Sequence, residues 1–164
     1  MPPRVAGATT AVRTPRAVLR CDGDVVNERF SVAPRCGDAP PRAEDARCVG
    51  IMRRVTAARL RYCGLDALMG DALTIVSELL TNAVLHSGTT EIRLTVTHQD
   101  DFLRIEVCDG QEGSIQPKSA NDNDQSGRGL TIVEGLVKEN DGKWGVSDDG
   151  TTVWCLLAAP QGGS

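Results

Sequence analysis

Three side chains suited to phosphate chemistry recur at a fixed spacing in the middle of the chain. Glu78, Asn82 and His86 are each four residues apart. In a helix, positions four apart stack along one face, so all three would project toward the same region. An amide oxygen at Asn82 is a hard ligand of the kind that Mg²⁺ prefers, with phosphate oxygens as further ligands. A carboxylate at Glu78 would accept a proton from an incoming water or serine hydroxyl, or would only orient a metal-bound water.

Two glycine-containing motifs follow this stripe. Asp109 and Gly110 fall at the end of an alternating segment, where a carboxylate can accept a hydrogen bond from an exocyclic amino group. Gly127, Arg128 and Gly129 precede a helical pattern, and a helix start offers free backbone N–H groups and a positive dipole end, both of which favour phosphate. Arg128 either adds a charge-assisted contact to a phosphate or lies on the surface.

Each feature also has an ordinary structural explanation. A mid-helix Asn is more often exposed than a ligand, and Asp-Gly after a strand is usually a turn. His86 at the end of its helix suits the negative end of the dipole in its protonated form and needs no catalytic role. The hypothesis of a site therefore depends on the motifs occurring together, in this order.

The elements that must position these motifs follow from hydrophobic periodicity and turn signals. Helices are predicted over residues 43–62, 66–86 and from 127 onward. Strands are predicted over 29–33, 91–97, 102–108, 143–147 and 151–157, with turns at 98–101 and 148–150. The polar segment 110–127 has no periodicity, so it is either an element that the pattern fails to reveal or a functional loop, or lid.

The first two helices are joined at Gly64, which suits a left-handed helix end, and Asp66 is predicted to cap the second helix. The expected buried set of helix 43–62 is Ala46, Val49, Met52, Val55, Ala58 and Tyr62. The expected apolar set of helix 66–86 is Leu68, Ala72, Ile75, Leu79 and Ala83, beside the polar stripe.

This order of elements predicts one α+β domain of 26–160, a two-layer α/β sandwich in which about three helices cover one face of a mostly antiparallel sheet. The total length of 164 residues fits a single domain. Residues 1–25 are rich in Pro, Ala, Thr and Arg without periodicity, and are expected to be a tail that is poorly ordered unless a partner fixes it.

Composition narrows the class of partner. A formal net charge of −4 and an aromatic share of 3% argue against direct nucleic-acid binding, which relies on clustered basic residues and on stacking. Six cysteines without a CxxC pair or a secretory leader predict reduced thiols. No run is expected to approach a membrane span, and these observations together predict a cytoplasmic protein with no membrane contact.

Together the motifs resemble the histidine kinase-like ATPase family, also called GHKL, over roughly residues 30–158. The segments SELLTNAVLHS and SGRGLTIVEGL are similar to the stand-alone branch of anti-sigma factor serine kinases and actinobacterial ATP-binding regulators. The resemblance implies a Bergerat-type ATP-binding fold with ATP and Mg²⁺ as cofactors. It implies Glu78 as the catalytic residue and Asn82 as the metal ligand. The remaining nucleotide contacts that it implies are Asp109, Gly110, Gly113, Gly127, Arg128, Gly129, Leu130 and Thr152.

Within that resemblance, Asp109 would recognise the adenine amine and Thr152 would help to hold the base through water. The first glycine box departs from the family pattern Asp-x-Gly-x-Gly, because the glycines after Asp109 are Gly110 and Gly113. Backbone contacts to the base are expected to differ for this reason. The lid has only Lys118 as a basic residue before Arg128, so closure over a triphosphate is expected to be weaker.

The function implied is a Mg-ATP-dependent protein-serine kinase that phosphorylates an anti-sigma factor antagonist and sequesters a sigma factor. The alternative is a non-catalytic ATP-dependent module that docks a partner or a second copy on helix 43–62. A third alternative is a scaffold that has lost nucleotide binding. A sensor histidine kinase is disfavoured because the chain has no room for a phosphoacceptor helix pair, and His98 falls in a predicted turn.

Overall fold

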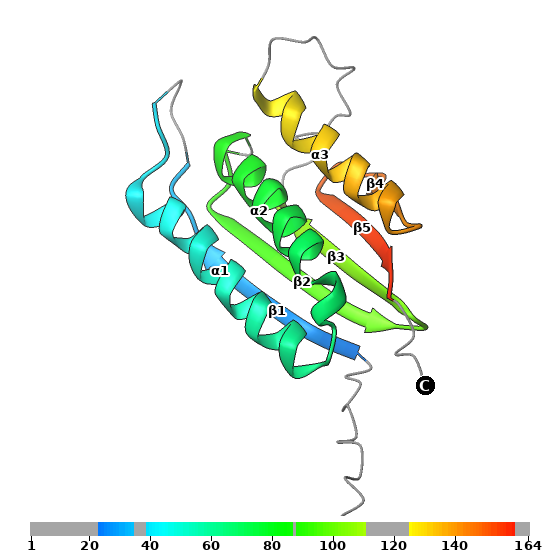
Figure 1. Cartoon of the computed structure of the whole chain (residues 1–164). Coiled ribbons are helices and arrows are strands. Elements are labelled where there is room, and N and C mark those ends of the chain that lie inside the picture. Colours follow the sequence, from blue (N-terminus) through cyan, green and yellow to red (C-terminus); the bar gives the residue numbers. More distant parts are fainter. Residues whose placement is uncertain (1–22, 35–38, 87, 111–124, 160–164) are drawn as a thin grey trace, which may run out of the picture.

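The computed structural model describes residues 23–34, 39–86, 88–110 and 125–159. Three α-helices lie on one face of a five-stranded sheet (Figure 1). The elements are β1 (Gly23–Ser31), α1 (Ala43–Tyr62), the short 3₁₀ helix η1 (Asp66–Leu68), α2 (Met69–His86), β2 (Glu91–Gln99), β3 (Phe102–Cys108), α3 (Gln125–Glu139), β4 (Lys143–Val146) and β5 (Thr152–Ala158). The predicted fold class and the predicted order of elements are confirmed.

The sheet has the strand order β1-β2-β3-β5-β4, and every described pairing is antiparallel. β3 and β5 are neighbours although α3 and β4 separate them in the sequence. Because they are antiparallel, the C-terminal end of β3 meets the N-terminal end of β5, and Cys108 pairs with Thr152. This topology brings Asp109 and the turn before β5 to the same end of the sheet.

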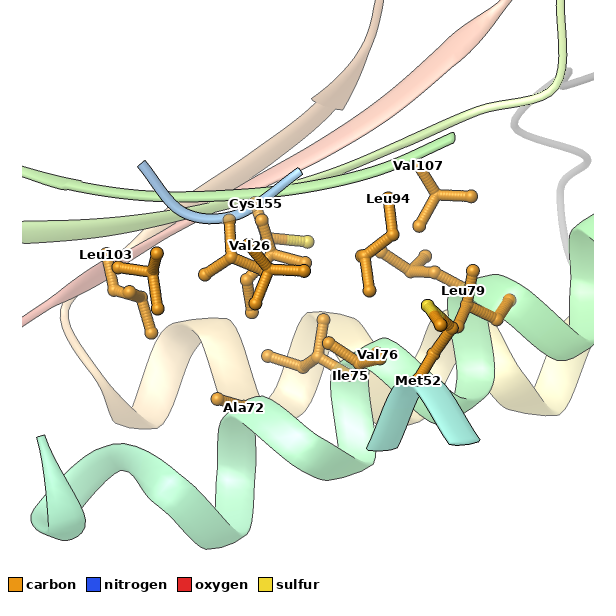
Figure 2. Close-up of a cluster of buried hydrophobic side chains, with 14 of the residues drawn as sticks. Val26, Met52, Ala72, Ile75, Val76, Leu79, Leu94, Leu103, Val107 and Cys155 are labelled. Carbon is orange, nitrogen blue, oxygen red and sulfur yellow. The ribbon is translucent and has the colours of Figure 1, made fainter. Parts of the chain in front are cut away.

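The core lies between the sheet and the helices. Alternate residues of β2, β3 and β5 are buried, as the predicted period of two requires. Figure 2 shows these side chains meeting the buried side of α2. Those fully or almost fully buried there include Ala72, Ile75, Val76, Leu79, Leu94, Leu103, Val107 and Cys155.

β1 is longer than the predicted strand 29–33 and begins earlier, within the segment expected to be tail. It pairs with β2 along its length, but the register shifts between Asp24 and Val26. Such a bulge places Val25 and Val26 both in the core, and both are 4% exposed. The bulge breaks the alternation that would have revealed the strand in the sequence. Residues 1–22 lie outside the described residues, so the predicted tail stays a prediction.

The connection between the first two helices differs from the prediction in one respect. Gly64 adopts the expected left-handed conformation, with φ of 71°. Asp66, however, does not cap α2: it begins η1, and no side-chain hydrogen bond caps this turn, whose N-cap is Leu65. The 3₁₀ turn leads directly into α2, so no separate cap is needed.

His98 was predicted to lie in a turn, and this prediction is wrong. It is the eighth residue of β2, pairs with Leu103 and is 4% exposed. The turn is shorter than expected because Asp100 and Asp101 both adopt positive φ, at 51° and 63°. Two such residues form a tight hairpin connection of the kind that matches strand twist.

Among the described residues, one helical segment, Asp66–His86, is long and apolar enough to span a membrane by length and composition, which the sequence analysis did not expect. Its apolar side chains face the sheet and the neighbouring helices in this structure (Figure 2). We therefore interpret it as a core helix.

None of the four described cysteines forms a disulfide in the described part of the chain. Burial raises the pKa of the Cys155 thiol to about 12. A thiol with that pKa stays protonated at neutral pH, so Cys155 is a packing residue and not a nucleophile.

Candidate nucleotide-binding site

The central feature of the site is the contact between α3 and the polar stripe of α2. Gly129 lies so close to α2 that a Cβ atom on it would be 2.7 Å from Glu78 Oε2 and 3.3 Å from Asn82 Nδ2. Gly129 is buried, whereas Glu78 and Asn82 are half-buried. The structure therefore brings together three of the predicted site residues, and a side chain at position 129 would displace the Glu78 carboxylate.

Glu78 and Asn82 reach this contact because α2 is continuous from Met69 to His86. One helical turn separates them, so their side chains lie along the same edge of α2. The next member of the stripe, His86, is the last residue of α2 and is exposed. It lies beyond the contact with Gly129, in agreement with its interpretation as a helix-end residue.

The start of α3 differs from the sequence prediction. The helix begins at Gln125, two residues before Gly127, so Gly127, Arg128 and Gly129 lie inside its first turns and do not form a turn ahead of it. The backbone N–H groups of residues 125–127 have no partner within the helix, and the dipole makes this end positive. Gly129 lies one turn further on, where its N–H bonds inside the helix. Gly129 has no side chain and so lets α2 come close, and its N–H is not available to bind phosphate.

Asp109 lies at the end of β3 and is 3% exposed. Its N–H donates to the carbonyl oxygen of Thr151 at 3.0 Å, which extends the β3–β5 ladder by one residue. Asp109 therefore continues the alternation of Ile105 and Val107 and turns toward the face that the helices cover. Gly110 follows with φ of 71°, a conformation that lets the chain leave the sheet at once.

Thr152 does not join these residues. It pairs with Cys108, and directly paired residues project from the same face of a sheet. That face is opposite to the one carrying Val107 and Val153, so Thr152 lies on the side of the sheet away from the helices. Its backbone N–H donates to Ser147 Oγ at 3.0 Å. The water-mediated role assigned to it stays a prediction.

Thr151 was not among the predicted site residues, although its carbonyl oxygen accepts the hydrogen bond from the Asp109 N–H. Its hydroxyl donates to Asp149 Oδ1 at 2.8 Å. Ser147 and the Thr151 N–H donate to the same oxygen, and these hydrogen bonds lower the pKa of Asp149. In the sequence, only the two adjacent threonines after Gly150 pointed to this position. The pairing register of β3 and β5 is needed to tell which of them lies beside Asp109.

The two parts of the site lie at the same end of the sandwich. In Figure 2, Leu79 of α2 faces the Val107 end of β3, and Ala72 lies toward the Leu103 end. Glu78 precedes Leu79, and Asp109 lies two residues beyond Val107. Gly113, Lys118 and the side chain of Arg128 lie outside the described residues. Leu130, next to Gly129, is partly buried against the core.

Within the described part of the chain, no group of three or more His, Cys, Asp or Glu residues could hold a metal ion. A divalent ion at Asn82 would therefore need most of its oxygen ligands from phosphate and water, which is how Mg²⁺ is commonly held at nucleotide sites. The amide of Asn82 faces the first turns of α3, where phosphate oxygens would bind, and this fits such an arrangement.

Comparison with known families agrees with this geometry. Residues 42–156 match the family described as histidine kinase-like ATPase domain. The match covers more than half of the chain, and the chain therefore belongs to this family of ATP-binding domains, whose members bind ATP with Mg²⁺. The search of curated proteins returned no significant match.

Proposed function

We propose that the chain binds Mg-ATP beside the α2–α3 contact and acts as a protein-serine kinase of the anti-sigma factor type. In this proposal it phosphorylates an anti-sigma factor antagonist and sequesters a sigma factor. The observation that carries the proposal is the contact of Gly129 with Glu78 and Asn82. It places the glycine motif in the first turns of α3 against a carboxylate and an amide, two groups that are used in phosphoryl transfer.

Each residue has a distinct role in this proposal. Asn82 Oδ1 would hold Mg²⁺, which neutralises phosphate charge when it is bound. Glu78, one turn away, would accept the proton of the attacking hydroxyl. The free N–H groups at the start of α3 would bind phosphate oxygens.

Base recognition would fall to Asp109. A buried carboxylate accepts hydrogen bonds, so it favours the exocyclic amine of adenine over the carbonyl that guanine has at that position. Gly110, with its positive φ, would let the backbone pass close to the base.

A second candidate function, a non-catalytic docking module, is favoured by the outer side of α1. Five exposed arginines lie on this helix: Arg47, Arg53, Arg54, Arg59 and Arg61. None forms an ion pair with another described residue. Ile51 and Tyr62 on the same helix are 39% and 65% exposed. A basic surface with apolar side chains on a chain of net charge −4 suits an acidic protein partner, or a second copy of this chain.

Calorimetric titration of ATP with and without Mg²⁺ tests nucleotide binding. We expect the wild type to bind ATP more tightly with Mg²⁺, and Asn82→Ala to lose that Mg²⁺-dependent part. Asn27→Ala, an exposed asparagine on β1, is the control and should behave as wild type. Equal affinity with and without Mg²⁺ in the wild type would contradict the proposal, as would an unchanged Mg²⁺ effect in Asn82→Ala.

Glu78→Gln separates the kinase from the docking module. The substitution keeps the volume beside Gly129 but removes the base, so phosphate transfer should fall by about 10²-fold or more while ATP affinity persists. The measurement is phosphate transfer to an antagonist protein, or phosphate release. If the wild type shows neither activity but still binds a partner only with ATP, the module is the correct function.

A further inference from the structure

A side-chain amide joins α2 and α3 at the end of their contact that is remote from the site. Asn140 follows the last residue of α3, and its Nδ2 donates to Asp71 Oδ2 at 2.8 Å. The same Nδ2 donates to the carbonyl oxygen of Leu136 at 2.8 Å. Asp71 lies in the first turn of α2, and both side chains are half-buried. We call this pair the Asp71–Asn140 clamp.

The clamp is itself fixed to the sheet. The carbonyl oxygen of Asn140 accepts a hydrogen bond from the Ala158 N–H at 3.0 Å, at the end of β5. Two residues later, the Gly142 N–H donates to the Val137 carbonyl at 2.9 Å. A Cβ on Gly142 would overlap the Leu156 carbonyl oxygen, so the chain leaves α3 in tight contact with the sheet. The C-terminal end of α3 is thereby fixed to both α2 and β5.

The clamp and the site are the two ends of one helix contact. Asp71 and Asn82 are eleven residues apart in α2, and Gly129 and Asn140 are eleven apart in α3. Eleven residues are about three helical turns, or about 16 Å, so each pair lies on one side of its helix. The helices run antiparallel, because Asp71 meets Asn140 at one end while Asn82 meets Gly129 at the other. Figure 1 shows α2 and α3 beside one another.

We propose that Asn140 is a positioning residue for the nucleotide site: through Asp71 it sets the axial register in which Gly129 meets Glu78 and Asn82. This inference rests on the proposed function of that site. Register matters there because a shift of α3 by one residue moves it about 1.5 Å and turns it about 100°. A residue with a Cβ would then face Glu78 and displace its carboxylate.

Apolar residues pack between the two ends, and the clamp adds a directional constraint to them. Ile75 on α2 and Val133 on α3 are fully buried, and Leu136 is packed against the core. Burial of such side chains is not directional, so it fixes the separation of the helices better than their axial position. A charge-assisted hydrogen bond depends on distance and angle, so the clamp supplies the missing constraint.

A simple helix-ending role does not account for the clamp. The Asn140 N–H already bonds to the carbonyls of Leu136 and Val137, both at 3.2 Å, so the backbone ends α3 and the Nδ2 bond to Leu136 only adds to this. The contact with Asp71 crosses to a different helix, 69 residues away in the sequence.

The test exchanges the two groups of the clamp. Asn140→Asp replaces the donor with a second carboxylate facing Asp71, and we expect the dissociation constant for Mg-ATP to rise roughly tenfold. The double variant Asp71→Asn, Asn140→Asp restores one amide and one carboxylate across the helices but not the bond to the Leu136 carbonyl, so it should recover affinity to within about threefold of wild type. Asn27→Asp makes the same chemical change on exposed β1 and should leave affinity unchanged.

Binding is measured by calorimetry well below the melting temperature of every variant, and kcat and KM for ATP are measured alongside. A purely structural role predicts a lower melting temperature with unchanged affinity for the folded Asn140→Asp protein, and that result would overturn the inference. Failure of the double variant to recover affinity would overturn it too. If the wild type itself does not bind Mg-ATP, the proposed function fails, and the positioning role fails with it. If the wild type binds Mg-ATP and Asn140→Asp binds it equally well, the positioning role of Asn140 is refuted and the proposed function is not.

Discussion

α1 and α2 are helices of similar length on the same face of one sheet, but they use their surfaces differently. α2 lies between α1 and α3 and contacts both. It buries Ala72, Ile75 and Leu79 and carries a polar stripe along the edge that meets Gly129. α1 has one neighbouring helix and exposes five arginines.

The difference shows how neighbours determine what a helix can do. A helix enclosed on several sides can carry polar groups only where they have partners or a ligand, so the stripe of α2 is informative about chemistry. A helix on the outside can carry charge freely, so the arginines of α1 bear on partner choice and solubility, and not on the fold. The predictions below test this contrast between α1 and α2.

The largest expected effect is on stability. Ile75→Ala on α2 removes a fully buried side chain and should lower the free energy of unfolding by about 2–5 kcal/mol. Ile51→Ala on α1 is the matched control, since Ile51 is 39% exposed, and it should change the same quantity by less than about 0.5 kcal/mol. Urea denaturation measures both. Equal losses would mean that the two helices are not buried as differently as the structure indicates.

Next in size is an effect on binding. Gly129→Ala places a methyl group against Glu78 and Asn82 and should weaken Mg-ATP binding by about tenfold or more. Gly50→Ala on α1 is the control, because nothing lies within 4 Å of its Cβ position. It should leave binding unchanged and stabilise the helix by up to about 1 kcal/mol. Titration calorimetry measures the Mg-ATP affinity of both variants. An unchanged affinity in Gly129→Ala would remove the main support for the site.

A smaller effect is expected at the start of α1. The Ala33 N–H donates to Asp45 Oδ2 at 3.3 Å, and Asp45 is 6% exposed. Asp45→Ala leaves that N–H without its partner and should cost about 1 kcal/mol of unfolding free energy. Glu44→Ala, the exposed neighbour in the same helical turn, should cost less, and thermal unfolding of the two variants compares them. A greater loss in Glu44→Ala would show that charge at the helix start matters more than the hydrogen bond.

The smallest predicted change has the opposite sign. Thr56 on α1 is fully buried, and its Oγ1 has no hydrogen-bond partner among the described residues. Thr56→Val keeps the shape and removes the unpaired hydroxyl, so it should stabilise the protein by up to about 1 kcal/mol. The control is Thr89→Val, which loses hydrogen bonds to the backbone of Glu91 and should destabilise. A destabilised Thr56→Val in urea unfolding would indicate a partner for that hydroxyl.

The same two helices show where periodicity in the sequence is reliable. The apolar set predicted for helix 66–86 combines steps of four with one step of three and is buried, apart from half-buried Ala83. The set predicted for α1 advances mostly by three, and each such step falls about 60° short of a full turn, so it drifts around the helix. Of that set only Met52 is buried, and the four buried positions of α1 are Asp45, Met52, Thr56 and Leu60. Polar residues in two of these four positions hid the buried face.

By itself the sequence determined the fold class, the helix carrying Glu78 and Asn82, and the two hairpins, because local periodicity and turn residues specify those features. Only the tertiary structure decided that Gly129 serves as space against α2, that Thr152 faces away from the helices, and that Asn140 reaches Asp71. Each of these depends on register between elements distant in the chain, and one residue of shift would change the contact. Local patterns predict that an element exists, and packing between elements determines which of its residues meet.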